Sequence, residues 1–225
     1  MDVPGNTRVW LKRTEQAQGR MRLQKGDGQR ALVAEREALR VLHAAGVAVP
    51  EVLAEGVDFI LLPDLGPNLS QIVARGLLTP DERVAAFAAA GAALAGMHRA
   101  GFAHGRPALR DFCWRDGQLR MIDLERFRNR KSGTMRRALD VVIFTHSWFA
   151  LPQSMRQGSE LEAALSAYRA AAPRGLWSAV GRWTQLLRPL DAIASWVARK
   201  RPGSAEVEAV SPAIACLRDA TRFGD

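Results

Sequence analysis

The sequence has few cysteines and no long apolar run, and these two features argue against disulfide-rich secreted proteins and membrane-spanning proteins. The two cysteines, Cys113 and Cys216, fit neither a disulfide framework nor the ligand spacing of a metal site. No run of about 18 apolar residues is present, so no membrane-spanning helix is predicted. The N-terminus also lacks the apolar segment of a signal peptide. These absences favour a reduced, cytoplasmic protein.

The composition is that of a globular chain with a basic surface. Its 225 residues suit one domain of two lobes or two small domains. Hydrophobic residues make up 48% and charged residues 24%, which excludes a disordered chain. The net charge of +9 favours anionic partners such as phosphates or acidic lipids. Nucleic acid is an unlikely partner, because no recognisable nucleic-acid-binding motif is present.

Strand signals lie early in the chain and helix signals lie later, which predicts an α+β protein. Turn residues at 63–68 mark the expected boundary between the two parts. A helix is expected at about 29–45, where leucines recur at helical spacing. The expected strands are residues 7–13, 20–25, 51–56 and 58–65.

A long helix is expected from Thr79 to about Ala100. Thr79 and Glu82 form a capping box, and Pro80 suits the first helical position. The many alanines in this helix allow close packing, so we expect it to be buried. A short hairpin should follow at 112–123, with its turn at Asp116-Gly117, and the segment 138–222 should be mostly helical.

Several segments, taken in this order, resemble the protein-kinase-like superfamily over about residues 10–150. "VWLK" is similar to the strand that supplies a phosphate-binding lysine, here Lys12. "AEREALRVLHAAGVAVP" resembles the helix whose glutamate pairs with that lysine; Glu35 fits the register better than Glu37. "ILLPDLGPNL", "LAGMHRAGFAHG" and "RMIDLERF" resemble the hinge, the approach to the catalytic loop and the turn that presents a metal-binding aspartate, here Asp123.

The closest likeness is to the small bacterial branch of lipopolysaccharide core kinases and other sugar and small-molecule kinases. It implies a two-lobed fold with a reduced N-terminal lobe at 1–66 and a mainly helical C-terminal lobe at 67–225. The segment 104–127 would be the catalytic-loop-like part. ATP and Mg²⁺ are the implied cofactors, because phosphoryl transfer depends on charge neutralisation and alignment. The implied acceptor is an anionic saccharide, a lipid or another small molecule with a hydroxyl group.

The catalytic loop departs from the family pattern at two positions. The family has His-Gly-Asp followed five residues later by Asn, whereas this chain has Arg106 and Asp111 at those places. Arg106 cannot act as a base, although it can bind phosphate. Asp111 can replace the amide as a metal ligand, so Asp111 and Asp123 would form a two-carboxylate magnesium site. The structural alternatives are an ion pair of Arg106 with Asp111 or Glu125, a strand-end cap for Asp123 and a packed, hydrogen-bonded His104.

The N-terminal part is short for such a fold. Only 11 residues precede Lys12, and they hold no glycine-rich phosphate loop. Either the lobe is reduced and Lys12 binds phosphate, or Lys25 does so under a covering hairpin made by residues 6–21. Lys12 is the preferred alternative. For both lysines, the alternative to phosphate binding is a purely structural role as a solvated charge on a strand.

Two later segments also carry functional hypotheses. The run "RFRNRKSGTMRR" (126–137) holds six Lys or Arg residues and no acid, and it lies where the resemblance places a substrate-facing segment; its alternative is a solvated loop. Asp140 would anchor the backbone of the catalytic loop, as the equivalent helix does in kinases. Aromatic and basic residues at 175–200 suit either packing on the core or an interfacial membrane helix, and we favour packing. Pro189 should kink or divide that helix.

Three functions remain open from the sequence. The first is an ATP-dependent phosphotransferase with Asp123, Asp111 and Arg106 as its site residues. The second is a pseudokinase, which binds or regulates without turnover. The third is a basic adaptor at an anionic membrane surface, which would place the protein peripherally at the inner face of the membrane.

Overall fold

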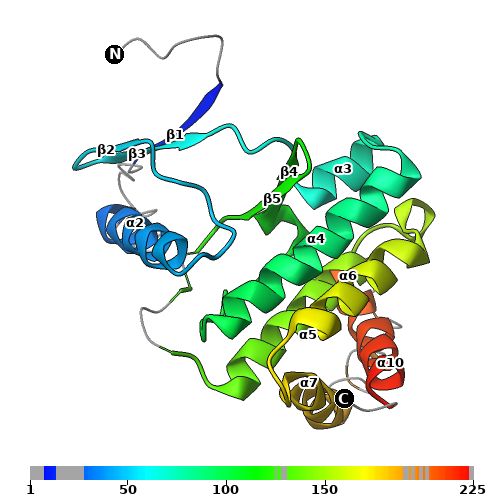
Figure 1. Cartoon of the computed structure of the whole chain (residues 1–225). Coiled ribbons are helices and arrows are strands. Elements are labelled where there is room, and N and C mark those ends of the chain that lie inside the picture. Colours follow the sequence, from blue (N-terminus) through cyan, green and yellow to red (C-terminus); the bar gives the residue numbers. More distant parts are fainter. Residues whose placement is uncertain are drawn as a thin grey trace.

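The computed structural model describes residues 8–13, 28–124, 126–127, 131–189, 193, 196–197, 200 and 203–222. Figure 1 shows a small sheet with helix α2 at one end and a group of packed helices at the other, with a hairpin between them. The mixed content of helices and small sheets agrees with the expected fold class. The division into lobes at residue 66 stays a prediction.

The three-stranded sheet is antiparallel and has the order β1-β3-β2. Lys12 pairs with Ile60 in its β1–β3 ladder. The strand expected at 20–25, together with Lys25, lies outside the described residues. The elements of this part are β1 Val9–Arg13, α2 Gly28–Ala44, β2 Ala54–Glu55 and β3 Phe59–Pro63.

The connector after β3 is fixed by the hairpin β4–β5. The amide of Trp114 donates to the carbonyl of Pro67 at 3.0 Å. At Gly66, where φ is +71°, an added Cβ would lie 2.5 Å from the carbonyl oxygen of Trp114, so only glycine fits there. Asn68 then caps α3, and its side chain accepts a hydrogen bond from the amide of Gln71. The hairpin and α3 have the bounds α3 Leu69–Arg75, β4 Phe112–Arg115 and β5 Gln118–Met121.

The helical part is built around α4 and α5. The capping box at Thr79 is present as predicted, and the alanine-rich α4 is buried along one side. Helix α4 packs along α6, and at Gly91 an added Cβ would lie 1.9 Å from the carbonyl oxygen of Ala164. Helix α5 packs against α7 and α10. The bounds are α4 Pro80–Arg99, η1 Leu109–Asp111, α5 Thr134–Phe149, η2 Gln153–Met155, α6 Gly158–Ala171, α7 Leu176–Leu186, α9 Ala205–Glu208 and α10 Val210–Thr221.

The aromatic helix packs mainly on the protein core. Trp177 and Val180 are buried, and the indole of Trp183 donates to the carbonyl of Met135 at 2.6 Å. This confirms the packing interpretation for the part of the stripe on α7, Leu176–Leu186, whereas Ile193 and Trp196 further along are exposed. Helix α7 ends before Pro189, as expected for a residue without an amide hydrogen. No helix in the described part of the chain is long and apolar enough to cross a membrane.

Candidate active site

A cavity of about 310 Å³ lies where the sheet, α2, the connector, α3 and the hairpin meet; we call it the hinge cavity. Its polar lining includes Lys12, Glu35 and Asp123, three of the residues singled out from the sequence. Its other lining residues are Trp10, Leu11, Leu62, Leu65, Gly66, Asn68, Gln71, Cys113 and Ile122. The cavity is therefore mainly apolar, with a few charged groups on its wall, as is usual for small-molecule sites.

Lys12 and Glu35 form an ion pair across this cavity wall. Glu35 lies on the buried face of α2 and is 5% exposed, whereas Glu37 is exposed on the same helix. The buried carboxylate fixes the lysine ammonium at the cavity, since a charge removed from water needs a partner. Phosphate binding by this pair stays a prediction.

Asp123 lies two residues beyond the end of β5, on the cavity wall. Its backbone adopts the left-handed conformation, with φ at 60°, which is uncommon for residues other than glycine and occurs often at functional sites. The strand end is held by His104, whose Nε2 donates to the carbonyl of Ile122 at 2.9 Å. His104 is itself almost fully buried, which confirms its interpretation as a packed, hydrogen-bonded residue.

Asp140 anchors the loop that contains His104, as predicted. One carboxylate oxygen of Asp140 accepts from the amide of His104 at 2.7 Å, and the other accepts from the amide of Gly105 at 3.0 Å. His98 Nε2 also bonds Asp140, and His98 Nδ1 bonds the hydroxyl of Tyr168. Burial lowers the pKa of His98, so the ring is neutral; it donates through Nε2 and accepts the tyrosine hydroxyl at Nδ1.

Asp111 lies behind the cavity wall rather than on it. It is 2% exposed, and its carboxylate accepts from the amide of Ala108 at 2.8 Å. The amide of Ile122 donates to its backbone carbonyl, which holds Asp111 beside the strand end that carries Asp123. Asp111 is not among the residues that line the cavity. The structure thus brings the two aspartates near one another but gives only Asp123 a place on the wall.

Burial raises the pKa of Asp111, and the nearby negative charge of Asp123 acts in the same direction. The hydrogen bond from Ala108 and the charges of His104 and Arg110 oppose the rise. Because the pKa of Asp111 is raised overall, its carboxyl is harder to ionise in the folded protein than in the unfolded chain, where it is in water. Ionisation of Asp111 therefore lowers the free energy of unfolding.

Replacing Asp111 by asparagine is therefore expected to raise the melting temperature near neutral pH. A carboxyl whose pKa is raised by folding stabilises the fold below its unfolded pKa, and this contribution is lost as the pH rises through the folded pKa. Asparagine keeps an acceptor for the Ala108 amide and has no charge to bury. Melting curves between about pH 4 and pH 8 should show a gain that shrinks toward acid. A variant less stable than the parent near neutral pH would contradict this account.

Arg106 is exposed, and no ion pair of its side chain is recorded with any residue that the structure describes. The predicted alternative of a pair between Arg106 and Asp111 is wrong, because Arg110 takes that place, with its Nε 3.7 Å from Asp111. Glu125, the other proposed partner, lies outside the described residues. The side chain of Arg106 is thus exposed to solvent in the loop that contains His104.

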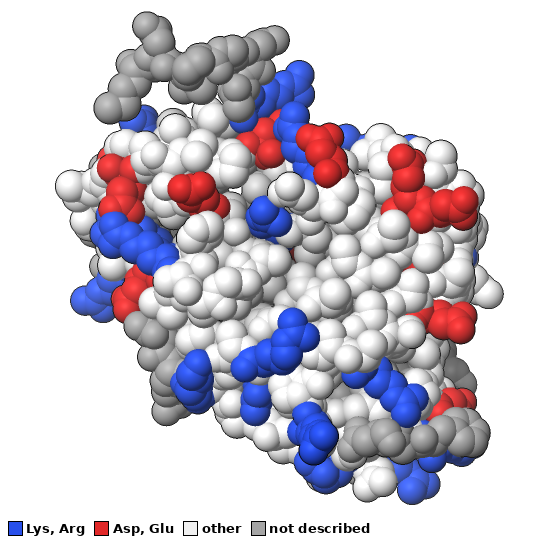
Figure 2. Space-filling model, viewed as in Figure 1, with Lys and Arg blue, Asp and Glu red and all other residues white. Residues whose placement is uncertain are grey.

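The basic run only partly matches its predicted role. Lys131 donates to the carbonyl of Ala100, and Arg137 donates to the carbonyl of His98 at 2.7 Å. Both cations therefore satisfy carbonyls at the C-terminal end of α4, where the helix dipole favours positive charge. Residues 128–130 lie outside the described residues. Figure 2 shows further Lys and Arg side chains gathered over the helices in the lower part of that face.

Sequence reasoning missed Trp10 on the wall of the hinge cavity and Asp64, which bonds Trp10. Trp10 is 60% exposed, and its indole donates to Asp64 at 3.2 Å. Asp64 also accepts from the amide of Gly66 and pairs with Arg115, and these interactions hold its pKa below the usual range. The sequence signal that could have indicated Trp10 is a large aromatic residue two positions before Lys12.

Comparison with known proteins is consistent with this geometry. The model of the family described as "Phosphotransferase enzyme family" matches residues 5–205. An uncharacterized protein of Haemophilus influenzae is 26% identical over 140 residues, which cover 62% of this chain. The match spans 58% of the length of that relative.

Proposed function

This chain belongs to the phosphotransferase enzyme family, and from that premise we propose that it transfers a phosphoryl group from ATP to a hydroxyl group of a small molecule. The observation that carries the proposal is the hinge cavity, where the ion pair of Lys12 with Glu35 and the carboxylate of Asp123 line one space. Family membership supports the protein-kinase-like superfamily. The lipopolysaccharide kinase branch stays a prediction.

The cavity offers separate places for the two ends of a nucleotide. Leu62 and Leu65 provide an apolar wall for the base, and the exposed ring of Trp10 provides a flat surface for stacking. Lys12 would contact the phosphates, because Glu35 fixes its ammonium group on the cavity wall. Asn68 and Gln71 add hydrogen-bonding groups to the same wall.

The donor set fits magnesium that arrives with a nucleotide. No group of three or more His, Cys, Asp or Glu in the described part of the chain is placed to hold a metal. Magnesium usually keeps several waters and binds through one or two carboxylates and the substrate phosphates. Asp123 would supply one carboxylate, and Asp111, directly behind it, is the predicted second ligand. Bound magnesium would neutralise charge on the transferring phosphoryl group.

The acceptor would lie on the Arg106 side of the loop. Arg106 offers a fork of donors for an anionic group, which suits a saccharide, lipid or other small molecule that bears phosphate or carboxylate. The basic helices in Figure 2 would attract the same class of acceptor. Proximity and charge neutralisation, rather than a protein base, would then account for the rate of phosphoryl transfer.

A pseudokinase is the second candidate, and Arg106 is the observation that favours it. Arginine stands where the family pattern has the aspartate that orients the acceptor hydroxyl, and loss of a general base typically costs about 10²–10⁴ in rate. Under this alternative the hinge cavity binds nucleotide, and the protein binds or regulates other molecules without transferring phosphate. Peripheral binding to an anionic membrane is compatible with either candidate.

Nucleotide binding can be tested with Cys113, which lines the hinge cavity. Burial raises the pKa of its thiol to about 11, so alkylation should be slow. We expect ATP with magnesium to slow alkylation of Cys113 further and to raise the melting temperature. Release of ADP with candidate acceptors then separates an enzyme from a pseudokinase. If saturating ATP with magnesium changes neither alkylation nor melting, both nucleotide-based functions fail.

A further inference from the structure

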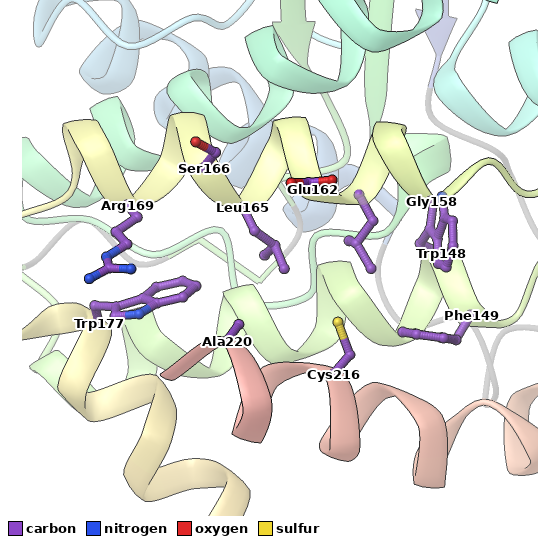
Figure 3. A pocket seen from close by; sticks show the side chains of 11 residues that line it. Trp148, Phe149, Gly158, Glu162, Leu165, Ser166, Arg169, Trp177, Cys216 and Ala220 are labelled. Carbon is purple, nitrogen blue, oxygen red and sulfur yellow. The ribbon is translucent and has the colours of Figure 1, made fainter. Parts of the chain in front are cut away.

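Two further cavities differ sharply in their chemistry. One, of about 530 Å³, lies among α5, α6, α7 and α10, and Figure 3 shows its mainly aromatic and aliphatic walls, which do not identify an occupant. The other, of about 830 Å³, lies between β1, the connector, α3 and β4; we call it the arginine cavity. Its lining residues are Arg8, Trp10, Pro63, Asp64, Gly66, Pro67, Gln71, Arg75 and Arg115.

Positive charge is in excess on the walls of the arginine cavity. Three guanidinium groups line it, and Asp64 is the one carboxylate among its described lining residues. Two positive charges therefore remain without a negative charge to balance them. The residues of the proposed phosphate site in the hinge cavity, Lys12, Glu35 and Asp123, are not among these lining residues. The excess charge thus belongs to a separate group of side chains.

Two of the three arginines have their donors free. Arg8 and Arg75 are exposed, and neither side chain has a hydrogen bond or an ion pair within the part of the chain that the structure describes. Arg8 is held at the cavity by its backbone, because its carbonyl accepts from the amide of Asp64 at 3.1 Å. Arg75 is the last residue of α3, one turn after Gln71 on the same face. Each guanidinium group keeps five N–H donors for a ligand.

The carboxylate of Asp64 is already used within the wall. Its Oδ1 accepts from the amide of Gly66 at 3.0 Å and from the indole of Trp10 at 3.2 Å. Its Oδ2 lies 2.5 Å from Nη1 of Arg115. The other terminal nitrogen of Arg115, Nη2, has no hydrogen bond to a described residue. Arg115 can therefore pair with Asp64 and still donate to an anion in the cavity.

We propose that the arginine cavity binds the phosphate group of a small molecule other than the nucleotide, through Arg8, Arg75 and Arg115. Guanidinium groups present paired donors that match two oxygens of a phosphate. A phosphate ester carries about 1.5 to 2 negative charges near neutral pH, which matches the excess positive charge of the walls. The volume lies within the usual range of small-molecule sites, about 300–1,000 Å³.

The neighbouring hinge cavity explains why this ligand would be a separate molecule. The two cavities adjoin, and Trp10, Gly66 and Gln71 line both. In the proposed function the base of the nucleotide lies at Trp10 and its phosphates lie at Lys12. The nucleotide therefore has no phosphate left for the arginines. This distinction rests on the proposed function, whereas binding of the anion itself does not.

The probe is inorganic pyrophosphate, titrated into the protein in a calorimeter without magnesium or nucleotide. A salt concentration of about 0.15 M screens distant surface charges. Arg8→Gln and Arg75→Gln should each weaken binding about fivefold, because each removes one charged donor group. Arg182→Gln removes the same charge from an exposed position on α7 and should leave the Kd unchanged. Absence of binding to the parent protein would overturn the proposal, and so would an equal loss in Arg182→Gln, which indicates nonspecific attraction to a basic surface.

Asp64→Asn is the sharpest variant, because the two oxygens of Asp64 have different partners. Asparagine keeps an oxygen for the amide of Gly66 and the indole of Trp10, and it removes the negative charge beside Arg115. Pyrophosphate should therefore bind about three- to fivefold more tightly. Asp219→Asn changes the net charge equally at an exposed site on α10 and should have no such effect. Unchanged or weaker binding in an Asp64→Asn protein that melts like the parent would overturn the proposal.

Reciprocal variants separate the two cavities. Lys12→Gln should leave pyrophosphate binding unchanged, and Arg75→Gln should leave unchanged the melting shift that ATP with magnesium produces. Loss of pyrophosphate binding in Lys12→Gln would place the anion in the hinge cavity. Loss of the ATP shift in Arg75→Gln would assign the arginines to the phosphates of the nucleotide, and either result overturns the proposal. If ATP binds nowhere, the pyrophosphate titrations of the Arg8, Arg75 and Asp64 variants still decide, so the two proposals fail separately.

Discussion

Replacement of Asp123 by alanine is expected to abolish the melting shift that ATP and magnesium produce, and to lower turnover by at least about 10²-fold. At ATP about 100-fold above its Kd, binding stabilises the fold by about 2.7 kcal/mol, which is about 5–10 °C for a domain of this size. The variant loses the carboxylate on the cavity wall and keeps Lys12 and Glu35. Differential scanning fluorimetry with and without nucleotide measures the loss.

Two controls separate the metal role from other effects of the change. Asp116 also has a positive φ, at 49°, but lies in the exposed hairpin turn outside the cavity. Asp116→Ala should therefore change the backbone preference equally and keep the nucleotide shift. Arg106→Ala should also keep the shift, since Arg106 would contact the acceptor. A full nucleotide shift in Asp123→Ala would contradict its place as a metal ligand.

Asp140→Ala should be the most destabilising single change in the helical part. Three donors would lose their acceptor: the amides of His104 and Gly105 and the Nε2–H of His98. Each buried unsatisfied donor costs about 1–3 kcal/mol, so the free energy of unfolding should fall by about 3–5 kcal/mol. The melting temperature would drop by roughly 10 °C.

Hydrogen exchange shows whether this loss is local to the loop. Peptides that cover residues 102–111 should exchange faster in Asp140→Ala, because the amides of His104 and Gly105 would be unpaired. Asp219→Ala is the matched surface control. Asp219 is exposed, and its ion pairs with described residues are those with Arg218 and Arg222, so its loss should stay within about 0.5 kcal/mol. Unaltered exchange at the loop would show that Asp140 is not its anchor.

The loop therefore depends on a buried polar network rather than on its own sequence. His104 holds the carbonyl before Asp123, and Asp140 holds His104 in turn. A substitution at Asp140 should therefore also disturb the cavity wall through these two contacts. A substitution at Asp123 should change the wall alone and leave the loop in place. Combining the two variants tests this order, since neighbours in one network give non-additive losses.

The sequence alone determined the elements whose signals are local. The capping box of Thr79 with Glu82, the hairpin turn at Asp116-Gly117 and the approximate bounds of α2 and α4 follow from contacts within a few residues of each other. The family resemblance favoured Glu35 over Glu37, and Glu35 is the residue that pairs with Lys12. The order of motifs along the chain identified the superfamily, because this order is kept even where single residues differ, and the narrower kinase branch stays a prediction.

Only the tertiary structure decided which distant groups meet. Lys12 reaches Glu35 across 23 positions, and Trp10 reaches Asp64 across 54, so neither contact follows from local pattern. Asp111 lies behind the cavity wall, because the Ala108 amide and the adjoining strand hold it there, and the magnesium site that it would share with Asp123 stays a prediction. The packing of α5 against α7 and α10 likewise depends on side-chain shapes from distant parts of the chain rather than on any single segment.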